Sequence, residues 1–163
     1  MRRLTKFSFS DKLKFEWAQL TGQGWEICGL TSIEAPDPDL RRAYDRFKFV
    51  VRYAADLKGD MMEVIQAIAI TSISISRDKH TEDRLVKIRA EYYSRTARDS
   101  INLITPKLNE YLFETPINGD NFSRLIDDLE QECFKYIDGC RAQQVLNFEE
   151  AAELAEEART EAE

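Results

Sequence analysis

Apolar and polar residues alternate between positions 4 and 32, and this pattern restricts the fold of the chain more than any other. A period of two with aromatic and β-branched side chains is typical of half-buried β-strands. Turn-forming residues at 10–12 and 21–24 divide the region into three runs. The sequence therefore predicts a three-stranded antiparallel meander. Its apolar positions are Leu4, Phe7, Phe9, Leu13, Phe15, Trp17, Trp25 and Ile27.

A helix is expected next. Pro36-Asp37-Pro38-Asp39 ends the sheet, with Asp37 as the N-cap and Pro38 in the first helical position. Apolar residues then recur at steps of three and four from Leu40 to Leu57, which predicts one amphipathic helix ended by Gly59. Its opposite side is rich in arginine. We interpret that side as a solvated face, with a basic wall for an anionic partner as the alternative.

Three further strands are predicted after this helix. Residues 61–65 favour a short helical turn, and residues 68–76 a strand with a bulge between Ile70 and Ile73. Residues 86–93 alternate cleanly, and residues 101–104 form a strand that Pro106 closes. The pattern leaves the structure of residues 107–118 open.

Two helices are expected in the C-terminal third. Asp120 is the predicted cap of the first, and Asn147 of the second. The fold class that follows is α+β: an antiparallel sheet of about six strands, with two main helices on one face and an acidic C-terminal helix. Residues 1–147 form one domain and residues 148–163 an acidic helical tail. The first helix has an apolar stripe of Phe122, Leu125, Ile126, Leu129, Cys133, Tyr136 and Ile137.

Charge is unevenly distributed along the chain. Residues 1–107 carry 19 basic and 15 acidic side chains, whereas residues 108–163 carry 4 and 15, and the net charge is −7. Seven glutamates lie in residues 149–163. Net charge therefore does not exclude an anionic ligand for the domain. The tail is expected either to fray or to pack on a partner.

We expect the protein to be cytoplasmic. The start of the chain lacks the apolar stretch of a secretory signal, and no apolar run approaches the length that crosses a bilayer. Three cysteines in open spacing are typical of a reducing compartment. We expect no membrane association.

No catalytic constellation is evident. The single histidine, His80, lies in a polar loop segment far in sequence from Cys28, Cys133 and Cys140, so neither a metal site nor a nucleophilic triad is indicated. None of the six glycines has the spacing of a phosphate-binding loop. We expect no catalytic residues, no metal and no cofactor.

The order of local motifs resembles a family of small uncharacterised proteins encoded by bacteriophages and prophages. The matching segments, within residues 1–145, are Pro36–Asp39, Thr71–Ser74, Asn102–Pro106 and Tyr136-Ile137-Asp138-Gly139-Cys140-Arg141-Ala142-Gln143. Ser72 replaces a glycine of the family pattern, and Cys140 replaces a lysine, which removes a cation from the last motif. The resemblance implies a phage protein that acts in the bacterial host cell, and it implies no particular activity.

Two clusters are candidate ligand-binding residues. Tyr136, Arg141 and Gln143, with Lys135, combine a stacking face, a guanidinium fork and an amide near a helix end. Arg89 and Tyr93 share one face of a predicted strand. The alternatives are a core position for Tyr136, a local ion pair for Arg141, and an ordinary exposed strand face for Arg89 and Tyr93.

These observations favour a non-enzymatic phage accessory protein. We expect it to bind and sequester a small anionic, nucleotide-like ligand, such as a host immune signal, as a homo-oligomer. One alternative is a protein–protein module that inhibits a host defence or DNA-binding complex through its acidic third. Another, less favoured because the basic content is modest, is a DNA-metabolism protein whose meander aromatics bind single strands.

Overall fold

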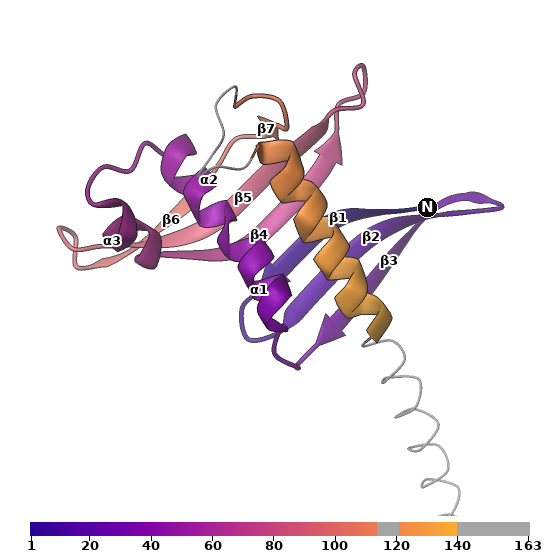
Figure 1. The fold of residues 1–163 in the computed structure, drawn as a ribbon, viewed down its shortest axis with the longest axis horizontal. Coiled ribbons are helices and arrows are strands. Elements are labelled where there is room, and N and C mark those ends of the chain that lie inside the picture. Colours follow the sequence, from indigo (N-terminus) through magenta and orange to yellow (C-terminus); the bar gives the residue numbers. More distant parts are fainter. Residues whose placement is uncertain (114–120, 140–163) are drawn as a thin grey trace, which may run out of the picture.

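The computed structural model describes residues 1–113 and 121–139, and it contains a single antiparallel sheet (Figure 1). The strands run in the spatial order β3-β2-β1-β4-β5-β6, with β7 paired to β5. This arrangement confirms the predicted α+β class. The strands are β1 (Arg2–Phe9), β2 (Leu13–Thr21), β3 (Gly24–Ser32), β4 (Ile68–Arg77), β5 (Arg84–Ser94), β6 (Asp99–Ile104) and β7 (Leu108–Asn109).

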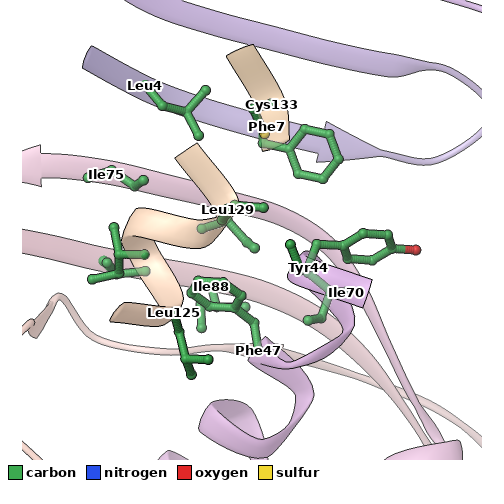
Figure 2. Packing of buried hydrophobic residues seen from close by; sticks show 14 of the residues in the cluster. Leu4, Phe7, Tyr44, Phe47, Ile70, Ile75, Ile88, Leu125, Leu129 and Cys133 are labelled. Carbon is green, nitrogen blue, oxygen red and sulfur yellow. The ribbon is translucent and has the colours of Figure 1, made fainter. Parts of the chain in front are cut away.

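The main helices lie on one face of the sheet. Helices α1 (Pro38–Asp45) and α2 (Phe47–Ala54) cross it beside a long helix at residues 122–139, drawn in orange in Figure 1. Their apolar sides meet the inner face of the sheet, and the side chains between them form one core (Figure 2). The seven stripe residues predicted for the 122–139 helix are all buried.

The meander forms as predicted, and its aromatics divide between the two faces. Phe7, Phe15 and Trp17 are buried under the helices, and Phe7 and Phe15 have ring centroids 5.1 Å apart. Trp25 alternates out of phase with these residues and stays 45% exposed. Gly24 takes φ +118° after the β2–β3 turn, a conformation that side-chain-bearing residues rarely adopt.

The single helix expected at residues 38–57 is divided at Arg46. The Asp37 side chain accepts a hydrogen bond from the Leu40 amide at 2.8 Å, as predicted for an N-cap. Arg46 has φ −61° and ψ −26°, and its carbonyl accepts from the Phe49 amide three residues on, so the helix tightens there without turning away. The predicted end at Gly59 is wrong, because α2 ends at Ala54 and Gly59 precedes the next helix.

The ambiguous region resolves into a short helix and a strand. Helix α3 (Met61–Gln66) leads directly into β4. The β4–β5 register shifts between Ile70 and Ser72, which confirms the predicted bulge. Strand β7 was not expected.

The 122–139 helix is capped by Asn121, whose Oδ1 accepts from the Arg124 amide at 2.7 Å. The expected cap, Asp120, and the predicted tail at 148–163 lie outside the described residues. No helix in the described ranges has both the length and the apolar character needed to cross a bilayer.

A buried ionic cluster attaches the 122–139 helix to the sheet. The Arg84 side chain is 11% exposed, and its guanidinium donates to Glu110 Oε2 and Asp127 Oδ1, both at 2.5 Å. It also donates to the Ser123 carbonyl and hydroxyl. Burial acts to raise the pKa of Glu110, but hydrogen bonds from Arg84 and Tyr111 and the charge of Arg84 hold that pKa below its ordinary value.

Candidate functional site

The face of the sheet opposite the helices, which no described element covers and which we call the uncovered face, carries an excess of positive charge. Its residues alternate with the buried ones, and the strand register places them in rows across the sheet. One row runs Lys14, Ser8, Ser72 and Arg89, and the next runs Glu16, Lys6, Ser74 and Lys87. None of the ion pairs formed by described residues includes these cations. The basic side chains of this face are Arg3, Lys6, Lys14, Lys87 and Arg89, and the acidic ones are Glu16 and Glu91.

The sheet is split between β1 and β4. These strands pair only from Lys6 opposite Ser74 to Ser8 opposite Ser72, and β1 has a register shift on β2 between Leu4 and Lys6. Beyond the shift, the Leu4 amide donates to Glu130 Oε1 of the 122–139 helix at 2.8 Å. A helix carboxylate thus replaces a neighbouring strand as the partner of this amide.

A pocket of about 210 Å³ lies at this split. Residues from β1, β2 and β3 form one side, the end of β4 forms the other, and Glu130 lies among them. We call it the split-sheet pocket. It is lined by Arg3, Leu4, Thr5, Ala18, Trp25, Ile75, Ser76, Arg77 and Glu130.

Two arginines and an indole give the split-sheet pocket its chemistry. The guanidinium carbon of Arg3 lies 4.4 Å from the centroid of the Trp25 ring, a cation–π contact that holds the arginine over the aromatic face. Arg77, on the other side, donates from Nη1 to the Glu82 carbonyl at 3.3 Å and has further N–H groups. The hydroxyls of Thr5 and Ser76 complete the polar lining.

Successive arginines at the start of β1 have different partners. Arg2 donates from Nη1 and Nη2 to the carboxylate of Asp138 at 2.6 and 2.9 Å, which ties β1 to the 122–139 helix and raises the pKa of Arg2. Arg3 is directed to the opposite face by the alternation of the strand, and it contacts Trp25. Only Arg3 lines the split-sheet pocket.

Glu130 is the acceptor of the split-sheet pocket. One carboxylate oxygen is bonded to the Leu4 amide, and the other lies 3.7 Å from Arg84 Nη1. These contacts fix the position of the carboxylate and connect it to the buried ionic cluster. A ligand amine or hydroxyl entering the pocket would meet an oriented acceptor.

A second polar hollow, between α1 and the 122–139 helix, is a weaker candidate site for an anion than the split-sheet pocket. It measures about 130 Å³ and contains Arg42 and Arg46. Arg42 lies 3.7 Å from Asp39, and Arg46 lies 3.2 Å from Asp128, so carboxylates of the hollow itself already pair with both cations.

The first predicted ligand cluster lies on the helix-covered side. Tyr136 is buried, its ring stacks on Phe15 with centroids 5.1 Å apart, and its hydroxyl donates to Ser32 Oγ at 2.9 Å. The structure thus places it in the core, the alternative weighed from sequence. Lys135 is exposed and pairs with Glu132 at 3.1 Å. Arg141 and Gln143 lie outside the described residues.

The second predicted cluster lies on the uncovered face. Arg89 and Tyr93 are exposed and point the same way from β5, with Glu91 between them. They are separated from the split-sheet pocket, because Tyr93 is at the far end of β5 from Arg84, which pairs with Arg77. The structure therefore does not bring the two predicted clusters together.

The pocket residues Arg3, Trp25, Arg77 and Glu130 were not predicted as site residues. For Trp25, the sequence does contain a signal. A two-residue turn pairs Trp25 with Leu20, and the alternation of the strands then places it on the face of the sheet opposite to that of the buried Trp17. The local sequence pattern predicts neither the split between β1 and β4 nor the contact of Glu130 with the Leu4 amide.

Within residues 1–113 and 121–139, no group of three His, Cys, Asp or Glu side chains is placed to hold a metal ion. No protein-family model matches this chain, and neither a curated protein nor a solved structure is significantly similar to it. What the protein binds must therefore be inferred from the side chains that the fold brings together.

Proposed function

We propose that the protein binds a small anionic, nucleotide-like molecule in the split-sheet pocket and holds it without turnover. The observation that carries this proposal is the convergence of Arg3, Arg77 and Trp25 on one pocket at the split between β1 and β4. Arginine matches phosphate with a planar fork of donors, and an indole offers a stacking surface for a base.

Each part of a nucleotide has a counterpart in the lining. A phosphate would lie between the Arg3 and Arg77 guanidinium groups, and the Trp25 ring would contact the base. Glu130 would accept from an exocyclic amine or a ribose hydroxyl. At about 210 Å³ the pocket is smaller than the roughly 300–1,000 Å³ typical of sites for drug-sized ligands. It therefore suits one nucleotide unit, with any second phosphate on the basic rows beside it.

The resemblance to phage-encoded proteins supplies a setting for this proposal. A binder that captures a nucleotide signal of the host would need orientation and affinity but no reacting group. The single carboxylate of the pocket, Glu130, is already bonded to the Leu4 amide, which suits a fixed acceptor.

Isothermal titration calorimetry against AMP, 3′,5′-cyclic AMP, a cyclic dinucleotide and ADP-ribose tests the proposal. We expect at least one of them to bind, and Arg77→Ala to weaken that binding by at least about tenfold, the cost of one charge-assisted hydrogen bond. Arg95→Ala is the matched control, because Arg95 is 82% exposed and lies in the turn after β5, at the other end of that strand from the Arg77–Arg84 pair. Absence of binding by all four ligands, or equal losses in both variants, would refute the proposal.

Single-stranded nucleic acid is a second candidate, and the excess of five basic over two acidic side chains on the uncovered face favours it. Such binding weakens with salt by about 0.7 log units per phosphate contact and per tenfold rise in salt. Oligothymidylate binding with a steep salt slope, lost in Lys87→Glu/Arg89→Glu and retained in Arg77→Ala, would identify this function instead.

A further inference from the structure

Strand β3 forms a long edge of the sheet that no described element covers. It runs nine residues from Gly24 to Ser32 and, among the described strands, pairs only with β2. At the other end of the sheet, β6 has six residues and is followed by Pro106, which cannot extend a ladder. Figure 1 shows β3 as the outermost strand of the meander.

The turn determines which backbone groups of β3 point outward. Thr21 pairs with Gly24 across a two-residue loop, so these residues exchange hydrogen bonds, and every second residue of β3 does the same with β2. The residues between them direct their N–H and C=O groups away from β2. Trp25, Ile27 and Gly29 are therefore available to pair with a further strand.

The side chains of this edge lack the usual protection against pairing. Edge strands that stay single commonly carry lysines, a proline or a bulge. The register of β3 on β2 is unbroken over nine pairs, and β3 has one charged residue, Glu26. Ile27 is 82% exposed and stands between Trp25 and Gly29 on the outer face.

These residues are complementary to themselves under a two-fold axis at Ile27. An antiparallel copy of β3 would then place Ile27 against Ile27 and Trp25 against Gly29, and these residues would exchange backbone hydrogen bonds. A half-exposed indole opposite a glycine leaves room for the ring over the bare backbone. Glu26 would face Cys28 of the other copy, so no like charges would lie directly opposite.

We propose that two copies of this chain associate through β3, antiparallel and two-fold about Ile27, to form one continuous sheet. The helices of both copies would lie on the same face of this sheet. The interface shares Trp25 with the proposed ligand site. Ile27 belongs to the interface alone and Arg3 and Arg77 to the ligand site alone, so substitutions at these residues separate the two proposals.

Analytical ultracentrifugation of the full chain tests the association. We expect a dimer, with Ile27→Lys raising its dissociation constant at least about tenfold, because two charges would then meet at the axis. Ile104→Lys is the matched control, since Ile104 is 57% exposed on the opposite edge strand. Circular dichroism establishes that each variant is folded. A wild-type monomer at all concentrations, or equal weakening by both substitutions, would overturn the proposal.

Disulfide trapping tests the register without destabilising the fold. In a Cys140→Ser background, Glu26→Cys would lie directly opposite Cys28 of the other copy, at a non-hydrogen-bonded position suited to a disulfide. Cys133 is buried and does not compete. We expect rapid covalent dimers from Glu26→Cys, and slow ones from the background alone and from Ser100→Cys on β6. Equal rates in all three, or fastest trapping through Ser100→Cys, would contradict pairing through β3.

Discussion

Single side chains connect the candidate site to the core. Glu130 bonds to the Leu4 amide at the split and also lies 3.7 Å from Arg84, whose other partners are Glu110 and Asp127. Because Arg84 is nearly buried, its charge must be matched by carboxylates. The acceptor of the split-sheet pocket is therefore held by the same cluster that attaches the 122–139 helix to β5.

Replacing Arg84 tests how much this cluster contributes to stability. Arg84→Met leaves Glu110 buried without its cation, and removal of one partner of a buried pair costs about 3–5 kcal/mol. Urea denaturation should show that loss, whereas Arg95→Met, at a surface pair with 3.9 Å between its charges, should change the free energy of unfolding by less than about 1 kcal/mol. Similar losses in both variants would mean that the cluster does not stabilise the fold.

The depressed pKa of Glu110 predicts a pH dependence. A carboxyl whose pKa is lower in the folded state stabilises the protein above its unfolded-state pKa, and this contribution is lost as pH falls toward the folded-state value. Unfolding free energies measured by urea should therefore decline below about pH 4.3, the ordinary pKa of glutamate. Glu110→Gln should have lower stability at neutral pH and a shallower decline in acid. An unchanged acid slope would contradict this assignment.

Among the elements, α1 begins where the sheet ends, and its start depends on a local signal. The Asp37 carboxylate accepts from the Leu40 amide at 2.8 Å, and Pro38 occupies the first helical position. Leu40, Ala43 and Tyr44 then pack on the sheet, so the cap orients a buried surface.

Removing this cap should weaken the fold modestly. Asp37→Ala is expected to lower the free energy of unfolding by about 1 kcal/mol, the usual cost of losing an N-cap, and Asp37→Ser should restore most of it. Thermal and urea unfolding of the two variants measure the difference. A serine variant as unstable as the alanine variant would show that the cap hydrogen bond is not the cause.

Elements were predictable from the sequence where their signals are local. The alternation of residues 4–32 and 86–93 and the stripe from Phe122 to Ile137 identify strands and a helix because side-chain periods follow from backbone geometry. The tightening at Arg46 and the two-residue strand β7 were not predictable. Both depend on contacts with distant elements: Arg46 pairs with Asp128, and β7 pairs with Leu85 and Val86.

At the scale of the whole molecule, helices cover one face of the sheet, and no element in residues 1–113 or 121–139 covers the other. The sequence predicted this class because three strands precede the first helix and three follow it. It did not predict the candidate site, because that site lies between β1 and β4, whose residues are about 70 positions apart in the sequence. Glu130 comes from a third segment. Tyr136 illustrates the same limit: its helical spacing fits both a ligand contact and the core position in which it is found.

The measurement that tests the central claim most directly is an amide and indole NMR titration of the full chain with AMP. If the split-sheet pocket binds nucleotides, the resonances that shift most will be the Trp25 indole N–H and the backbone amides of Arg3, Leu4 and Arg77. Those of Lys135 and Tyr136, which do not line the pocket, will stay in place. Shifts confined to the 122–139 helix, or no shifts at millimolar AMP, would contradict the account.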